Sequence, residues 1–141
     1  ARRNLSGCGL QTAALAFGGY TTGGVGLANT ESFNGTTWTS VNGLNTGKIS
    51  IASAGTQTAA LGMGGTSSGG PGSTAVESWD GTNWSTVPPM STARTVAAGA
   101  GTQPLALTMG GESGPGGTLY SSSEEWTGTP STGTASNLTT S

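Results

Sequence analysis

The chain has 141 residues, a length typical of one ordinary domain, and its formal net charge is only −2. Charged residues make up 7% of the positions, and no basic patch interleaved with aromatic residues is present, which argues against nucleic-acid binding. No apolar run approaches the roughly 20 residues of a membrane span. The chain has no histidine, the commonest general base and metal ligand, so we expect no catalysis, no metal site and no cofactor.

One nine-residue segment occurs three times at an interval of 46 residues, at 11–19, 57–65 and 103–111. In each copy large apolar side chains alternate with small ones before a glycine pair, as Leu15 and Phe17 alternate with Ala14 and Ala16. Because successive side chains of a strand point to opposite faces, each copy predicts a strand with one bulky face and one flat face. Such strands suit stacked sheets, in which the bulky face of one unit rests on the flat face of the next.

Each unit is expected to begin with a strand that a glycine-containing turn joins to the repeated segment. These first strands are predicted at residues 3–8, 49–54 and 95–100. A loop with further glycine follows each glycine pair, at residues 20–29, 66–74 and 112–117. The three loops are the longest and least similar connections of the chain, and connections of that kind carry binding specificity on a repeated scaffold.

A third strand combines an acidic residue with an aromatic one, in Glu31-Ser-Phe33, Glu77-Ser-Trp79 and Glu124-Glu-Trp126. The last copy comes one residue late, so we expect an insertion in the loop before it. Asn34-Gly35 and Asp80-Gly81 then predict tight hairpin turns into a fourth strand that contains Trp38 or Trp84. In the third unit Ser131 stands at the tryptophan position, so the outer strand there is expected to be weak or absent.

A glycine doublet, an aromatic residue, a tryptophan and then a basic residue, in units of 46 residues, resemble the kelch repeat. The matching residues are Gly18-Gly19, Phe33, Trp38 and Lys48, then Gly64-Gly65, Trp79, Trp84 and Arg94, and in the third unit Gly110-Gly111 and Trp126. The wording GTQTAAL…GG…E…DGTNW is also similar to kelch-type repeats in tail-fibre and other virion proteins of marine bacteriophages. The resemblance implies blades of a β-propeller, which usually has six or seven blades in a ring.

The fold implied is all-β, with three kelch-like four-stranded blades that make half of a six-bladed propeller. Blade 1 is expected at residues 1–46, blade 2 at 47–92 and blade 3, with a degenerate outer strand, at 93–141. Because a three-blade arc leaves an apolar face open at each end, we expect self-association through the faces of blades 1 and 3, with a second copy completing the ring. The alternatives are further blades from a longer chain, since the sequence does not begin with Met, and a β-solenoid or fibre wall.

Most of the charged residues form two repeated sets, one basic (Arg2, Lys48, Arg94) and one acidic (Glu31, Glu77, Glu124). The first and third strands of an antiparallel meander start on the same face, so these residues are predicted to form ion pairs that tie strands together. The alternative is a ring of Arg and Glu around a channel mouth that binds a polar ligand. The aromatic Tyr20 has no aromatic counterpart in the other loops, and we expect it to face solvent. The candidate binding residues are therefore Tyr20, Arg2, Lys48, Arg94 and Glu112.

Two further residue types are expected to serve packing. The tryptophans at positions 38, 79, 84 and 126 are predicted to anchor blades rather than to stack on sugars. Cys8 stands where the other units have alanine, so we expect it to be an inert small residue.

The function expected from these features is non-enzymatic. We expect a structural or attachment module displayed on a virion, as in a phage fibre, or on another extracellular surface. Its partners would be a second copy, other virion proteins or a surface glycan, and neither nucleic acid nor a membrane. The alternative is a glycan- or peptide-binding propeller that uses the long loops after each glycine pair.

Overall fold

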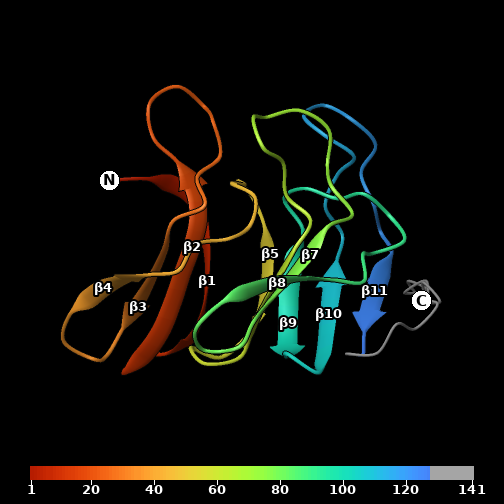
Figure 1. Ribbon diagram of the computed structural model, residues 1–141. Coiled ribbons are helices and arrows are strands. Elements are labelled where there is room, and N and C mark those ends of the chain that lie inside the picture. Colours follow the sequence, from red (N-terminus) through yellow and green to blue (C-terminus); the bar gives the residue numbers. More distant parts are fainter. Residues whose placement is uncertain (128–141) are drawn as a thin grey trace.

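The computed structural model describes residues 1–127, and in this part of the chain all regular structure is β-strand (Figure 1). Eleven strands form three antiparallel sheets, and within each sheet the strands are ordered as they are in the sequence. The expectation of an all-β chain built from antiparallel sheets is therefore confirmed. Residues 1–127 contain no helix long and apolar enough to cross a membrane.

The three sheets follow one another along the chain. Sheet 1 consists of β1 (Arg3–Leu10), β2 (Ala13–Tyr20), β3 (Thr30–Phe33) and β4 (Trp38–Val41). Sheet 2 consists of β5 (Ala52–Gly55), β6 (Ala60–Met63), β7 (Val76–Trp79) and β8 (Trp84–Val87). Sheet 3 has β9 (Ala98–Thr102), β10 (Leu105–Met109) and β11 (Ser123–Trp126) among the described residues. The weak or absent outer strand predicted around Ser131 lies outside them.

The strand register locates the extra residue of the third unit. Trp126 lies opposite Ala106 in sheet 3, as Trp79 lies opposite Ala60 in sheet 2. The pairing of the two strands is thus unchanged, although the third unit is longer by one residue. The extra residue therefore lies in the loop between β10 and β11, and the predicted insertion is confirmed.

Sheets 1 and 2 pack through the bulky face of β2. Leu15 and Phe17 are buried in a cluster with Ala60 of β6, and the Phe17 ring lies over Gly62. A Cβ added to Gly62 would lie 3.2 Å from the Phe17 ring, so no larger residue fits there without a shift. Trp84 closes this core, with its ring edge-on to Phe17 and the centroids 4.7 Å apart. The predicted packing of a bulky strand face on a flat one is confirmed at this junction.

The junction between sheets 2 and 3 repeats the same arrangement one unit later. Leu61 and Met63 are buried in a second cluster with Ala106 of β10. Trp126 packs against this cluster from sheet 3. The middle sheet is therefore covered on both faces, whereas within the described part of the chain sheets 1 and 3 each have one neighbour.

Backbone hydrogen bonds also join the first strands of the sheets, with β5 in contact with both β1 and β9. The amide of Ser50 donates to the carbonyl of Asn4, and the amide of Val96 donates to the carbonyl of Ser50, both at 3.1 Å. These three residues occupy the same position of the repeat, and their φ angles of 53°, 55° and 56° are in the left-handed region. The amides of Ser50 and Val96 thus bond to the preceding unit, and β5 and β9 begin after these residues, at Ala52 and Ala98, later than predicted.

Asn34-Gly35 and Asp80-Gly81 lie in hairpin turns, as the sequence predicts. Each loop holds four residues, however, because Phe33 pairs with Trp38 and Trp79 pairs with Trp84. The Asn34 side chain accepts hydrogen bonds from two backbone amides within the loop, at 3.0 and 2.9 Å, and the Asp80 carboxylate does the same in its own loop. Side-chain capping of this kind stabilises the wider turn.

Candidate functional site

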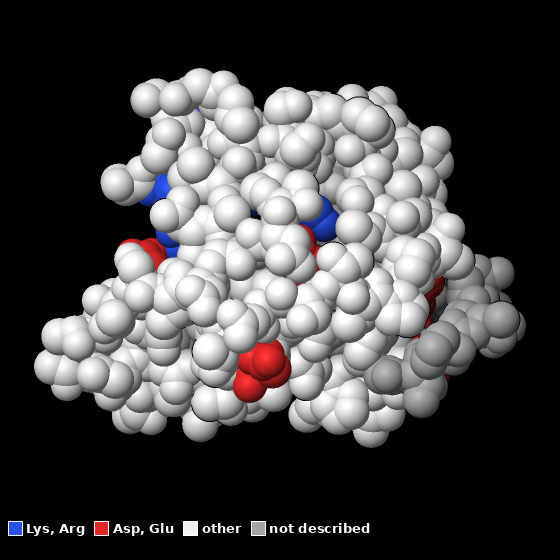
Figure 2. Space-filling model, in the orientation of Figure 1, with Lys and Arg blue, Asp and Glu red and all other residues white. Residues whose placement is uncertain are grey.

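The three variable loops lie along one edge of the molecule, at the top of Figure 1. The amide of Gly26 in the first loop donates to the carbonyl of Ser67 in the second at 2.6 Å. The amide of Gly72 in the second loop donates to the carbonyl of Ser113 in the third at 2.7 Å. The loops therefore form one continuous polar edge, and charged atoms are sparse over the face drawn in Figure 2.

Arg94 does not reach that edge, because its side chain is 0% exposed. Its guanidinium pairs with the Glu124 carboxylate at 3.2 Å and donates to the carbonyls of Gly110 and Ser122 at 2.7 and 3.0 Å. The guanidinium also lies over the ring of Tyr120, 5.0 Å from its centroid. The charge of Arg94 thus holds β10, β11 and the loop between them together.

The Glu124 carboxylate also binds the loop that precedes sheet 3. The amides of Ser91 and Thr92 donate to it at 2.7 and 3.0 Å, and the Ser91 hydroxyl donates at 2.7 Å. Burial by itself would raise the pKa of Glu124, but the hydrogen bonds from Ser91, Thr92 and Arg94 outweigh burial and hold that pKa below its usual value. The ion pair therefore connects sheet 3 to the segment that leaves sheet 2.

Glu77 makes the corresponding contacts one unit earlier. It accepts hydrogen bonds from the amides of Asn45 and Thr46 at 2.7 and 3.3 Å. Lys48 is buried, and burial lowers its pKa, while the negative charge of Glu77 opposes that shift. Lys48 and Glu77 are thus placed inside the junction between sheets 1 and 2.

Arg2 and Glu31 form the corresponding pair in the first unit, at 2.9 Å, but on an open face. The Glu31 side chain is 40% exposed, whereas that of Glu124 is 6% exposed. The difference arises because no sheet precedes sheet 1 in the structure. The predicted ion pairs are confirmed for Arg2 with Glu31 and for Arg94 with Glu124, whereas Lys48 and Glu77, both described, do not come within ion-pair distance.

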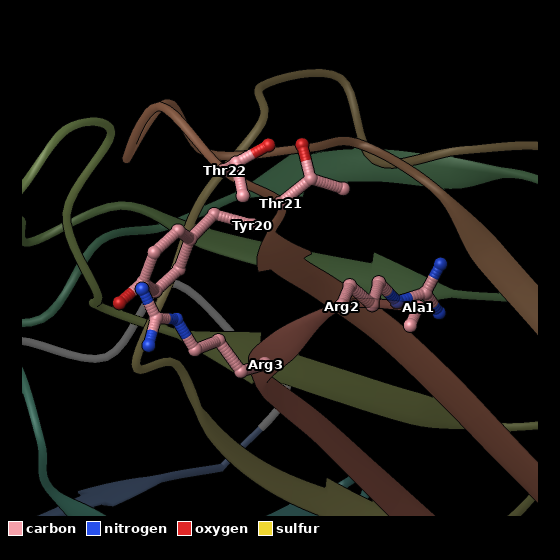
Figure 3. Close-up of a pocket in the computed structure, with 6 residues that line it drawn as sticks. All are labelled: Ala1, Arg2, Arg3, Tyr20, Thr21 and Thr22. Atoms are coloured by element: carbon pink, nitrogen blue, oxygen red, sulfur yellow. The ribbon is translucent and has the colours of Figure 1, made fainter.

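Tyr20 is half-buried at the end of β2 and lines a hollow of about 340 Å³ with Arg2, Arg3, Thr21 and Thr22 (Figure 3). The Arg3 guanidinium lies over the Tyr20 ring, 4.8 Å from its centroid, while Arg2 extends to the other side of the strand. The hollow therefore offers one exposed cation, an aromatic ring and two hydroxyl groups. These groups suit an anionic, polyhydroxylated ligand.

Arg3 was not among the candidate residues from the sequence. It stands where the other units have Ile49 and Thr95, so it interrupts the repeat, and that mismatch is the signal that could have identified it. Arg3 has no basic counterpart in the other units, so the repeat by itself does not point to it.

Glu112 lies in a different hollow, of about 320 Å³, which it shares with Val96, Leu119 and Tyr120. Its backbone pairs with that of Thr95 in both directions, at 3.0 and 2.9 Å. The two hollows share no residue, so the structure does not bring the five candidate residues into one site. Tyr20 and Arg2 line one hollow, Glu112 lines another, and Lys48 and Arg94 are buried between strands and sheets.

The acidic residues and the cysteine of the described part do not gather in one place. Among residues 1–127, no three His, Cys, Asp or Glu side chains lie close enough to hold a metal ion. Burial raises the pKa of the Cys8 thiol to about 11, so the thiolate that acts as a nucleophile is scarce near neutral pH.

The tryptophans differ in exposure although they recur in the sequence. Trp79 and Trp84 are buried in the core between sheets 1 and 2, and Trp126 packs in the core between sheets 2 and 3. Trp38 is 51% exposed on the open face of sheet 1. Trp38 therefore does not anchor packing between sheets within one chain, contrary to the prediction for this residue.

Comparisons with known proteins bear on the fold. The sequence matches no protein-family model, and comparison with curated proteins gives no match. Among solved structures, the chain is similar to the structure of YjhT, with a TM-score of 0.79 and 15% sequence identity. The similarity covers 97% of this chain and 46% of YjhT, so the chain spans less than half the length of that protein. At this identity the two share an arrangement of strands.

Proposed function

We propose that the three sheets are kelch-like blades of a β-propeller and that the chain is a non-enzymatic module of a virion or other extracellular surface, with a structural or attachment role. The observation that carries the proposal is that the repeated charged residues of the second and third units are buried in contacts within and between the sheets. Arg94 and Glu124 are buried in contacts that join strands and sheets, and Lys48 and Glu77 lie inside a junction. Groups that could have done chemistry are thus committed to holding the sheets together.

The sheet junctions support the propeller part of the proposal. Each junction places a bulky strand face on a flat one, and the first strands are joined by equivalent backbone bonds. The strand arrangement similar to YjhT is consistent with such an array. Loops rich in Gly, Ser and Thr with few charges suit a surface that is displayed to solvent.

Antibody labelling tests the location. Antibodies raised against the purified chain should decorate intact particles or cells of the source, seen by immunogold electron microscopy, without permeabilisation. Pre-incubation with the purified chain serves as the control and should abolish the label. Label that appears only after lysis would contradict display on a surface.

A second candidate function is binding of an acidic glycan or acidic peptide at the hollow around Tyr20. The observation that favours it is the Arg3 guanidinium stacked on the Tyr20 ring, with two threonine hydroxyls beside it. A carboxylated sugar would place its charge near Arg3 and its hydroxyls near Thr21 and Thr22.

A glycan array followed by calorimetric titration tests this candidate. Arg3→Ala and Tyr20→Ala should each weaken binding by about tenfold, the effect of losing one charge-assisted hydrogen bond or one stacking contact. Leu10→Ala is a matched control, because Leu10 is exposed in the same sheet but outside the hollow. An array without hits, together with no binding of acidic peptides, would contradict a binding function.

A further inference from the structure

The two sheet junctions within the chain use equivalent residues, and this equivalence identifies two faces that have no neighbour among residues 1–127. Ile51 and Trp84 of sheet 2 are covered by sheet 1 and are 6% and 5% exposed. Their counterparts in sheet 1, Leu5 and Trp38, are 43% and 51% exposed. Sheet 1 thus has an open flat face, formed by Leu5, Ala14, Ala16, Phe33 and Trp38, that matches the covered face of sheet 2.

Sheet 3 has the opposite open face. Leu61 and Met63 of sheet 2 are buried under sheet 3, whereas their counterparts Leu107 and Met109 are only partly buried. Ala54 is buried in the same junction, and its counterpart Ala100 is exposed. A hollow of about 370 Å³ lies here, lined by residues that include Ala100, Leu107 and Glu125. The open bulky face of sheet 3 is therefore formed by Ala100, Leu107 and Met109, with Glu125 at its side.

We infer that the open bulky face of sheet 3 binds the open flat face of sheet 1 in a second copy of the chain. The pairing repeats the geometry of the two internal junctions, in which a bulky face meets the flat face that follows it. Because each copy has one face of each kind, two copies can make the same contact twice and leave no face open. The inference rests on the sheet contacts and is independent of the proposed attachment role.

Hydrogen-bonding groups on the two faces are complementary as well. At the internal junctions, the Gln57 side chain donates to the Ser32 hydroxyl at 2.9 Å and to the carbonyl of Phe33. The Gln103 side chain repeats both bonds on Ser78 and Trp79. Gln11, the third member of this set, is exposed on sheet 1.

The acceptors that Gln11 would meet on the second copy are the Glu125 carboxylate and the Trp126 carbonyl, which correspond in register to Ser78 and Trp79. A carboxylate in place of a hydroxyl makes this bond stronger. The backbone offers a further hydrogen bond. Within the chain, Ser50 donates to Asn4 and Val96 donates to Ser50, so the amide of Asn4 and the carbonyl of Val96 are left at the two ends of this series and could bond to each other between copies.

The Arg2–Glu31 pair is consistent with the same partner. Its counterpart Arg94–Glu124 is enclosed by the junction between sheets 2 and 3. Glu31 is exposed because no sheet within residues 1–127 covers the corresponding face of sheet 1, and a second copy at that face would enclose it in the same way. Two copies together would have about the length of YjhT, of which one chain covers 46%. A closed pair also avoids the open filament that repeated face-to-face contacts would otherwise build.

Light scattering coupled to size-exclusion chromatography tests the inference on the full chain. We expect about twice the chain mass of 13.6 kDa. Ala14→Arg on the flat face and Ala100→Arg on the bulky face should each give the mass of one chain. Val25→Arg is the matched control, since Val25 is exposed in a loop away from both faces, and it should leave the doubled mass unchanged.

Mixing the two blocked variants identifies which faces meet. The Ala14→Arg chain keeps its bulky face and the Ala100→Arg chain keeps its flat face, so the mixture has one intact junction and should form a one-to-one complex. Fluorescence of the buried tryptophans checks that each variant is folded. Gln11→Ala, a mild change, should raise the dissociation constant roughly tenfold.

Three results would overturn the inference. The first is a single-chain mass for the unchanged protein at tens of micromolar, which would mean that some other segment or further sheets of a longer chain cover the faces. The second is growth into polymers of increasing length. The third is a doubled mass that persists in both Ala14→Arg and Ala100→Arg, which would place the contact elsewhere.

Discussion

The indole N–H of Trp84 donates to the hydroxyl of Thr30, 3.0 Å away across the junction between sheets 1 and 2. The bond fixes a buried ring of sheet 2 to the third strand of sheet 1. Trp38 is the equivalent residue of sheet 1 and has no preceding sheet to meet. Mutation of Trp84 therefore tests packing within the chain, and mutation of Trp38 tests a face that has no neighbour within the described chain. The two residues form a matched pair.

Trp84→Ala should lower the free energy of unfolding by about 3–5 kcal/mol, because it empties part of the core and leaves the Thr30 hydroxyl without its donor. Trp38→Ala should cost only about 1 kcal/mol, through the loss of its contact with Phe33 at 5.0 Å between ring centroids. Urea titrations in the Ala100→Arg background measure both changes on a chain with one face blocked. Equal losses would contradict the different burial of the two rings.

Arg94→Met should destabilise the fold by about 3–5 kcal/mol, since the Glu124 carboxylate would remain buried without its cation. Arg2→Met should cost about 0–1 kcal/mol, because Glu31 remains in contact with water. Urea titration in the same background measures both. The double variant Arg94→Met/Glu124→Gln should recover part of the lost free energy of unfolding. No recovery would mean that Arg94 stabilises the fold through the packing of its guanidinium and not through its charge.

Glu124 should make the stability of the protein depend on acid pH. Its pKa in the folded chain lies below the usual 4.5, so the unfolded chain binds the proton more tightly than the folded one. The stabilisation is therefore complete above about pH 5 and is lost as the pH falls through the pKa of the folded state.

The corresponding experiment compares Glu124→Gln with the unchanged residue, both in the Ala14→Arg background, by urea titration between pH 2.5 and 7. The difference in unfolding free energy should be largest at neutral pH and should shrink as the pH falls. Glu125→Gln is the neighbouring exposed control and should shift the curve little. A difference that is constant with pH would show that the carboxylate charge does not stabilise the fold.

Cys8 should react slowly with thiol reagents. Its pKa of about 11 leaves a very small thiolate fraction at pH 8, and its sulfur lies 3.5 Å from the carbonyl of Thr56 in the next sheet. Labelling by a disulfide reagent should be at least tenfold slower than in urea. A cysteine placed at an exposed loop position away from both open faces, Val25→Cys with Cys8→Ser, should react at the rate of an ordinary surface thiol. Fast labelling of Cys8 would contradict its raised pKa.

Much of the local structure was predictable from the sequence because it depends on neighbours in the chain. Alternation in residues 13–17 assigns Leu15 and Phe17 to one strand face and the alanines to the other. The starts of β5 and β9 were predicted wrongly, because Ser50 and Val96 bond to an adjacent sheet and nothing in their local sequence specifies that contact.

The candidate site was predictable only in part. Recurrence pointed to the Arg and Glu residues, and the structure pairs Arg2 with Glu31 and Arg94 with Glu124. A search for recurring residues does not find Arg3, because the equivalent positions of the other units hold the uncharged Ile49 and Thr95. The Arg3 guanidinium lies over the Tyr20 ring because Arg3 and Tyr20 are opposite each other where β1 and β2 pair, and this register was not worked out from the sequence.

The repeat interval and the alternation of side-chain size were enough to establish the units, their strands and the face on which each large residue lies. Only the assembled sheets show that Trp84 and Arg94 are buried while their counterparts Trp38 and Arg2 reach water. The reason is physical: the orientation of a side chain is set by its own backbone, whereas its burial depends on whether another sheet stands opposite.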